Sequence, residues 1–166
     1  AFTGKSLQEL GLTNISDLTK VVPNVDMGIG NGTTGTGNAF IRGIGARNTG
    51  VNYDSGVGIY VDNVYVSRAD GAIVDNVDVQ SVQVLRGPQG TLFGKNTTGG
   101  AILYATNRPE DEFGGNALVR VGNYNKIDST LTVNVPLVGD TLMSRFSLYQ
   151  TKNDGYVQSE IPDDLP

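Results

Sequence analysis

The segment VQSVQVLRGPQGTLFGKNTTGGAILYATNRP, residues 79–109, decides the fold that we expect for this chain. It contains two apolar runs, residues 82–85 and 101–105, that alternate with polar residues and carry β-branched side chains, which is typical of strands. Between them a Gly-Pro pair predicts a turn, and residues 90–94 suit one short helical turn. We therefore predict a small βαβ-like unit that presents its loops at one edge for recognition.

The Gly94-Lys95 pair within this segment also suggests a phosphate-binding loop. That loop needs a glycine, four residues, and then Gly-Lys followed by serine or threonine. Gln89 stands where the first glycine is required, and Asn96 stands where the magnesium-binding hydroxyl is required. The broken spacing argues against a nucleotide-dependent enzyme, and a nucleotide-binding titration would test that reading.

The glycine-rich segment LRGPQGTLFGKNTTGGAI, residues 85–102, resembles the plug of TonB-dependent outer-membrane receptors and transporters. Residues 40–43 are similar to the first Arg-Gly strand of that family, and residues 58–65 resemble its central hairpin. Residues 114–156 resemble its opening barrel strands, so the likeness covers most of the chain in order. It implies an α+β plug domain, a small mixed sheet with short helices, followed by the first antiparallel strands of a transmembrane β-barrel of about 22 strands.

The composition favours a loop-rich β protein. The chain has 166 residues, of which 23 are glycine and 38% are hydrophobic, and this length suits one domain, or one domain and part of another. A net charge of −5 with scattered basic residues gives no nucleic-acid footprint. The sequence contains neither cysteine nor histidine, so thiol chemistry, disulfides and histidine-based catalysis are excluded.

Two short helices are expected near the amino end. Ser6 and Glu9 have the spacing of a capping box, which predicts a helix that begins at Ser6. Asn14 or Ser16 is placed to cap a second helix, which Pro23 would stop. Both helices carry leucines on one face, which indicates packing.

The residues up to 79 read as short strands joined by glycine-rich loops. We expect a loop over residues 27–38, a strand over 39–41 and a second loop over 44–56. Residues 57–61 and 64–66 predict a hairpin, because the two residues between them tolerate positive φ. Residues 73–79 suit a short helix.

A change of pattern divides the chain into three parts. We expect the plug over residues 1–109, an acidic linker over 110–114 and the first barrel strands over 115–166. In the last part the odd-numbered residues from 127 to 135 lie on one face of a strand, largely apolar, and the even-numbered ones are polar. With the predicted tight turn over residues 136–140, this alternation is typical of outer-membrane strands.

Two arginines, Arg42 and Arg86, follow apolar strands and precede glycine. The resemblance implies that they pair with barrel glutamates and lock the plug to the wall by guanidinium–carboxylate contacts. The alternative is that each merely caps its own sheet. The resemblance also implies that polar plug loops face the outside and meet the ligand through Arg47, Asn48, Tyr53, Arg68, Lys95 and Asn96.

The chain offers no catalytic constellation and no metal or cofactor site. Asp75 and Asp78 lack the further spaced oxygen ligands of a calcium loop. No acid–base pair or activated nucleophile is recognisable, so we do not expect an enzyme.

The resemblance implies active transport of a scarce nutrient across the outer membrane of a Gram-negative bacterium, with the plug gating the barrel from inside its lumen. The substrate would be a ferric siderophore or similar chelate, although cobalamin, haem and oligosaccharides are also carried by the family. The partners would be TonB, acting with ExbB and ExbD, and the lipid around the barrel, with no nucleic acid. Nothing in residues 1–5 resembles the TonB box, which we expect upstream.

Two alternatives stay open at this point. The three strands of residues 115–166 do not close a barrel of about 22 strands, so the chain is either part of a full barrel or a stand-alone relative that does not transport. The second alternative to a transporter is a soluble binding module that reuses the plug fold. The apolar stripe of residues 127–135 argues against that module.

Overall fold

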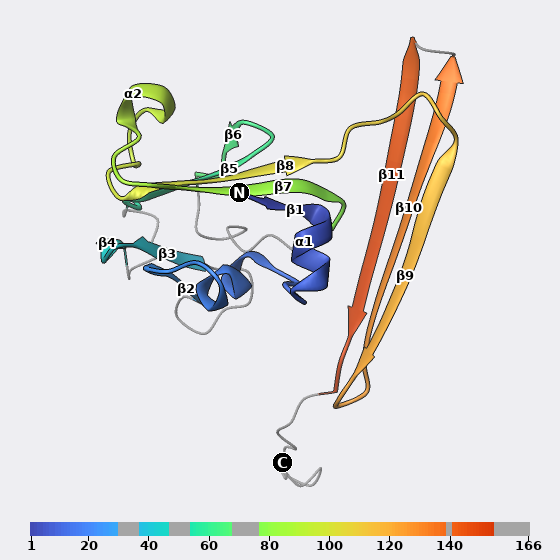
Figure 1. The fold of residues 1–166 in the computed structure, drawn as a ribbon, viewed down its shortest axis with the longest axis horizontal. Coiled ribbons are helices and arrows are strands. Elements are labelled where there is room, and N and C mark those ends of the chain that lie inside the picture. The colour runs from blue at the N-terminus through green and yellow to red at the C-terminus, as the bar shows by residue number, and fades with distance from the viewer. Residues whose placement is uncertain (30–36, 47–53, 68–76, 139–140, 155–166) are drawn as a thin grey trace, which may run out of the picture. The chain divides into compact units, whose positions relative to one another are not determined.

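The computed structural model describes residues 1–29, 37–46, 54–67, 77–138 and 141–154 (Figure 1). The chain divides into two compact units, Ala1–Asn107 and Arg108–Pro166. Among the described residues, no helix is long and apolar enough to cross a membrane.

The first unit contains a larger and a smaller sheet with short helices between their strands. The larger sheet has the strand order β1-β7-β8-β5-β6, and the smaller has the order β2-β3-β4. Because β8 pairs antiparallel with β7 and parallel with β5, the larger sheet is mixed, as predicted. The elements are β1 (Phe2–Thr3), α1 (Gly4–Glu9), the 3-10 helix η1 (Ile15–Lys20), β2 (Val25–Ile29), β3 (Gly37–Ile41), β4 (Ile44–Gly45), β5 (Val57–Val61), β6 (Val64–Tyr65), β7 (Val79–Arg86), α2 (Gly90–Phe93) and β8 (Gly100–Thr106).

The segment β7–α2–β8 lies at the centre of the larger sheet. Both predicted strands and the helical turn are confirmed, although each strand is longer than its apolar run. β7 and β8 are antiparallel neighbours, so the segment is a hairpin with a helical loop, and the βαβ-like interpretation is wrong. Gly100 is required where the strands meet, because a Cβ there would lie 2.2 Å from the Leu85 carbonyl oxygen and its φ is +150°.

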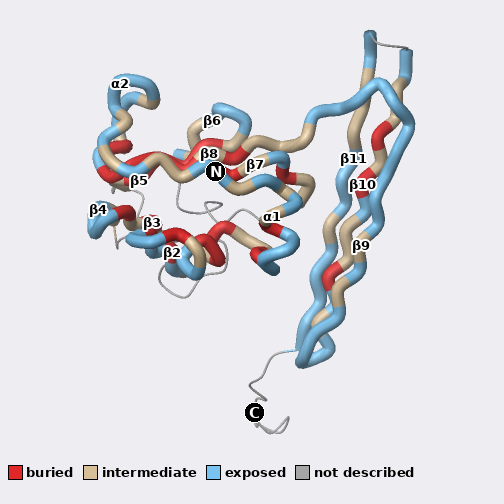
Figure 2. The backbone as a smooth tube through the Cα atoms, viewed as in Figure 1, coloured by how far each residue is buried: buried red, intermediate tan, exposed pale blue. Residues whose placement is uncertain are grey.

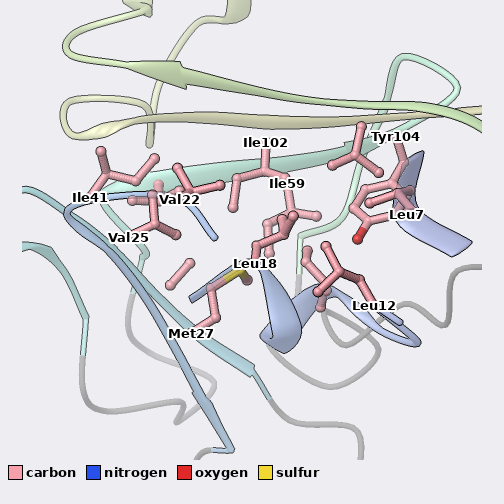
Figure 3. Packing of buried hydrophobic residues seen from close by; sticks show 14 of the residues in the cluster. Leu7, Leu12, Leu18, Val22, Val25, Met27, Ile41, Ile59, Ile102 and Tyr104 are labelled. Carbon is pink, nitrogen blue, oxygen red and sulfur yellow. The ribbon is translucent and has the colours of Figure 1, made fainter. Parts of the chain in front are cut away.

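The core of the first unit lies between the larger sheet on one side and η1, β2 and β3 on the other (Figure 3). Its centre is formed by Ile15, Leu18, Ile41, Val82 and Ile102, each with 0% of its surface exposed. Burying one such side chain contributes roughly 1.5–3 kcal/mol. A shared core between short elements from many parts of the chain therefore holds this unit together.

The N-cap of helix α1 lies three residues earlier along the chain than the predicted cap, Ser6. Thr3 is the N-cap, and its hydroxyl accepts a hydrogen bond from the backbone N–H of Ser6 at 3.2 Å. Ser6 is therefore inside the helix, and the capping box from Ser6 to Glu9 is wrong. The reason is that Thr3 ends strand β1 with an extended backbone, which is the geometry of an N-cap.

Helix η1 confirms the predicted cap at Asn14. The Asn14 side chain accepts from the backbone of Asp17, and the Asp17 side chain accepts from the backbone of Asn14. The Asp17 carboxylate also accepts from Thr13 and from Lys20 Nζ at 2.6 Å. Burial alone would raise the pKa of Asp17, but the hydrogen bonds from Lys20, Thr13 and Asn14 outweigh it and lower the pKa below its ordinary value.

Strands β2, β3 and β4 correct two predicted loops. β2 and β3 pair from Val25 opposite Ile41 to Ile29 opposite Gly37, so the ends of the predicted loop over residues 27–38 are strand. The loop expected over 44–56 starts with β4, which pairs with β3. Glycine-rich strands of two to five residues carry too few apolar positions for a periodic signal. Residues 30–36 and 47–53 lie outside the described part of the chain.

The hairpin of β5 and β6 is confirmed. Its turn residues, Asp62 and Asn63, have φ of +48° and +67°, as a two-residue hairpin turn requires. The helix predicted over residues 73–79 does not reach its expected end, because Val79 begins strand β7. Residues 73–76 lie outside the described residues.

The second unit is a sheet of three antiparallel strands in the order β11-β10-β9 (Figure 1). The strands are β9 (Gly114–Gly122), β10 (Lys126–Val138) and β11 (Leu142–Lys152). The predicted turn over residues 136–140 starts too early, since Pro136 is still in β10 and faces Met143. Pro136 is tolerated there because the register shifts between Pro136 and Val138, where the ladder is irregular.

The two faces of this sheet differ as the alternation predicts. One face gathers exposed apolar side chains, namely Val119, Val121, Ile127, Leu131, Phe146 and Leu148. On the opposite face Asp128, Thr132 and Asn134 of β10 are buried. Figure 2 shows isolated buried positions within this otherwise exposed or half-buried sheet. The polar residues are thus covered and the apolar residues exposed, the reverse of the first unit.

Candidate functional site

The first strand-end arginine lies in a tight turn. Arg42 and Gly43 connect β3 to β4 with φ of +54° and +80°. The backbone N–H of Arg42 donates to the Asn24 carbonyl at 2.8 Å, which holds the turn against the segment before β2. The Arg42 side chain is exposed.

The second strand-end arginine lies where β7 meets β8. Arg86 is the last residue of β7 and pairs with Gly100. A Cβ built on Gly100 would lie 2.8 Å from Ile41 Cδ1, and Ile41 directly precedes Arg42. The structure therefore brings the two strand ends together. No salt bridge among the described residues involves either arginine.

The predicted ligand-facing residues divide into two groups. Arg47, Asn48, Tyr53 and Arg68 lie outside the described residues. Lys95 and Asn96 are in the loop between α2 and β8, where Lys95 is exposed. Asn96 has a φ of +66°, and its amide donates to the Tyr65 hydroxyl at 3.2 Å, so its side chain ties the loop to β6.

An aromatic cluster that the sequence analysis did not identify supports this loop. The Tyr60 ring lies 5.0 Å from Phe93 and 5.4 Å from Tyr65, measured between ring centroids. The Tyr60 hydroxyl donates to the Phe93 carbonyl at 2.8 Å. Burial, and then the neighbouring Tyr65, raise the pKa of Tyr60, so it stays a neutral donor. Tyr60 and Tyr65 are Cα partners in the hairpin that the sequence predicts. That pairing is the feature of the sequence from which the aromatic cluster could have been predicted.

Close packing around Thr97 completes the support of the α2 loop. The buried Thr97 hydroxyl donates to the Gly94 carbonyl at 2.8 Å, and a Cβ on Gly58 would lie 2.7 Å from Thr97 Cγ2. Backbone bonds from Gln89 to Thr97 at 2.9 Å and from Gly87 to Gly99 at 3.0 Å close the base of the loop. The α2 loop, at the end of the sheet that carries Arg86, is therefore held by hydrogen bonds and close packing, and it exposes Lys95.

This arrangement is suited to binding. The described residues contain no group of three or more acidic, histidine or cysteine side chains placed to hold a metal ion. Asp78, one half of the acidic pair considered for calcium, accepts a hydrogen bond from Asn107 at 2.8 Å. Two strand-end guanidinium groups and the Lys95 ammonium make the recognition of carboxylate or other anionic groups the chemistry that this end offers.

The fold of the first unit is that of a plug domain. The family model of the TonB-dependent Receptor Plug Domain matches residues 1–101, and the chain belongs to that family. The predicted resemblance is thereby confirmed.

Individual proteins of this class are similar to the chain in sequence or in fold. The chain is 36% identical over 78 residues to the pesticin receptor of Yersinia pestis, covering 47% of this chain and 12% of the receptor. The solved structure of the ferric yersiniabactin uptake receptor FyuA from Yersinia pestis matches 89% of this chain and 23% of that one, with a TM-score of 0.78 and 28% identity. The pyoverdine outer membrane receptor FpvA from Pseudomonas aeruginosa PAO1 shares the fold, with a TM-score of 0.74 and 23% identity over 93% of this chain and 22% of that one.

The chain is thus similar to TonB-dependent receptors, which are transporters, over both of its units. It spans less than a quarter of the length of FyuA. The fold prediction, a plug with a small mixed sheet and short helices followed by antiparallel strands, is confirmed by these matches.

Proposed function

We propose that this chain is the plug and the first barrel strands of a TonB-dependent receptor that imports a ferric siderophore or a similar chelate through the outer membrane. The observation that carries the proposal is the succession of a plug fold and a sheet whose apolar face is exposed. The likeness to a ferric yersiniabactin uptake receptor supports the choice of substrate class. On this proposal the protein is a transporter and performs no catalysis.

The exposed apolar face of β9–β11 would contact lipid, and the polar face would line the lumen that holds the plug. Apolar-out and polar-in alternation is the pattern of outer-membrane strands. Strands with this pattern expose no apolar surface to water once a barrel is closed in a membrane. This accounts for exposed side chains such as Leu131, Phe146 and Leu148, which a sheet in water would need to cover.

The plug loops would form the outward ligand surface. We assign recognition to Arg47, Asn48, Tyr53, Arg68 and Lys95, because their cations and hydrogen-bonding groups suit an anionic chelate. Asn96 lies in the same loop as Lys95 and is assigned to the same ligand surface. Its amide donates a hydrogen bond to the Tyr65 hydroxyl.

TonB, driven by ExbB and ExbD and the proton gradient of the inner membrane, would pull on the amino end of the plug and open a path. Arg42 and Arg86 would lock the plug to carboxylates of the barrel wall until then. Their support is the approach of the two strand ends and the absence of a carboxylate partner for either among the described residues.

Uptake by the intact gene product tests the function. A deletion strain grown under iron limitation should lose growth on at least one ferric siderophore of a panel, and the full-length gene should restore it only with TonB present. Full growth of the deletion strain on every chelate of the panel would contradict the transport proposal. A soluble full-length protein that needs no detergent would favour a binding module instead.

Replacing the loop residues tests ligand recognition. The variant Arg47→Ala/Tyr53→Ala/Arg68→Ala should weaken substrate binding about tenfold or more, because charge-assisted hydrogen bonds are lost. The control Lys5→Ala removes an exposed cation from α1 and should leave binding unchanged. Unaltered affinity in the triple variant, at normal outer-membrane abundance, would assign recognition to other loops.

The lock is tested in the full-length protein by the variant Arg42→Ala/Arg86→Ala. It should raise amide exchange across the plug and admit small antibiotics through the barrel. Unchanged exchange together with an unchanged barrier would show that the arginines only cap their own sheet ends.

A further inference from the structure

The carboxyl end of β8 is held from one side by the β5–β6 turn. The Asp62 carboxylate accepts from the backbone N–H of Thr106 at 2.9 Å and from the Thr106 hydroxyl at 2.8 Å. The backbone N–H of Asp62 donates to the Tyr104 carbonyl at 2.9 Å. A turn residue 44 positions away thus makes two hydrogen bonds to Thr106, the last residue of β8, and a third to Tyr104 of the same strand.

The next residue is held from the other side by the segment before β7. The backbone N–H of Asn107 donates to the Asp78 carbonyl at 3.0 Å, and the Asn107 amide donates to the Asp78 carboxylate at 2.8 Å. Residues 106 and 107 are therefore attached to the sheet on both sides.

The linker is held separately by the sheet of the second unit. Asn134, 3% exposed on the polar face of β10, accepts from the backbone N–H of Glu110 at 2.9 Å. Its amide donates to the carbonyls of Glu110 and Glu112. One side chain satisfies three backbone groups of a segment with no strand partner. Gly114, the Cα partner of Asn134, lies two residues after Glu112, so these hydrogen bonds of Asn134 fix the start of β9.

Between these attachments lie residues 108 and 109. Both are exposed, and the structure gives no hydrogen bond from either to another described residue. Pro109 has no backbone N–H to donate.

We propose that residues 108 and 109 form a two-residue joint between plug and strand sheet, and that Asn134 is the positioning residue that confines it. Residues 106 and 107 then move with the plug, while residues 110–112 stay on the polar face of β10. The joint is a property of the junction whether or not the protein transports. Only its use during gating rests on the proposed function.

Residue-resolved amide hydrogen exchange on the full-length protein in detergent, without substrate, tests this joint. The amides of Thr106, Asn107 and Glu110 should be protected, and that of Arg108 should exchange rapidly. In Asn134→Ala, exchange at Glu110 should become about tenfold faster, the effect of losing one hydrogen bond. Thr106 and Asn107 should keep their protection.

Three further variants distinguish a direct hydrogen bond to Glu110 from a general loosening of the linker. Asn134→Asp keeps an acceptor for the Glu110 N–H but loses the donors, so Glu110 should stay more protected than in Asn134→Ala. Asn116→Ala removes the same side chain from an exposed position on the same face of β9 and should change nothing at the linker. Asp62→Asn should release Thr106 and leave Glu110 protected.

Equal protection of Arg108 and Thr106 would overturn the two-residue joint. Unchanged exchange of Glu110 in Asn134→Ala would overturn the positioning role. Because neither readout involves substrate, a failed uptake assay leaves this result intact, and the reverse also holds.

Discussion

The two units bury opposite kinds of side chain. In the first, Ile15 and Ile102 are fully enclosed, whereas in the second Leu148 is 69% exposed and Asn134 is 3% exposed. The first has the arrangement of a domain that folds in water, and the second has the apolar-out, polar-in arrangement on which the proposed membrane contact rests. If the second unit lies in a membrane, as proposed, each unit must be tested in its own solvent.

The largest effect is expected from separating the units. Residues 1–112 should give a compact monomer in water of modest stability, since a domain of this size buries only about 60–65% of its unfolded surface. Residues 1–166 should associate in water, because the apolar face and open strand edges are added. Size exclusion and circular dichroism with and without detergent measure the difference. If residues 1–166 were monomeric without detergent, with the amides of Leu131 and Phe146 protected from exchange, the apolar face would be packed on a soluble core. The two units would then not differ in this way.

The next largest effect concerns the core of the first unit. Ile102→Ala should lower the free energy of unfolding of residues 1–112 by about 2–5 kcal/mol, because it leaves a cavity between the sheet and η1. Should that variant not fold, Ile102→Val should still cost about 0.5–1.5 kcal/mol. The control Leu10→Ala, at a helix end 53% exposed, should cost less than about 0.5 kcal/mol in the same urea titration. An equal loss of unfolding free energy in Ile102→Ala and Leu10→Ala would show that Ile102 is not enclosed in a core.

An effect of similar or smaller size is expected on the apolar face of the second unit. Leu131→Arg in the full-length protein should destabilise the folded state in a bilayer by up to about 2–4 kcal/mol, the cost of a cation at mid-membrane depth. Its neighbour Thr130→Arg changes the polar face and should be tolerated. Equal outer-membrane abundance of the two variants would show that neither face contacts lipid.

The smallest effect is pH-dependent and belongs to the first unit. The folded-state pKa of Asp17 is lowered, so its contribution is present above the ordinary value of 3.8 and is lost as the pH falls through the folded pKa. Asp17→Asn should therefore be less stable at pH 7, by about 1 kcal/mol. The difference should vanish in strong acid. The exposed Asp26→Asn is the control in the same titrations, and a gap that persists unchanged below pH 3 would contradict the assignment.

Much of the fold was predictable because its signals are local. The alternation of residues 127–135, the Asp62-Asn63 turn and the glycine-rich hairpin loop each act through neighbours in sequence. The positions of Arg42 and Arg86 at strand ends follow for the same reason. The proximity of those ends does not, since it depends on Ile41 packing at Gly100.

What the sequence by itself determined is the class of fold and the apolar face of the strands after the plug, because periodicity states which side of each strand is apolar. What only the tertiary structure decided is how distant polar groups satisfy one another. Tyr60 binding Phe93, Asp62 binding Thr106 and Asn134 binding Glu110 join residues 24 to 44 positions apart. No local pattern specifies such pairs, because they form only where the packing of distant segments has brought a donor within reach of an acceptor.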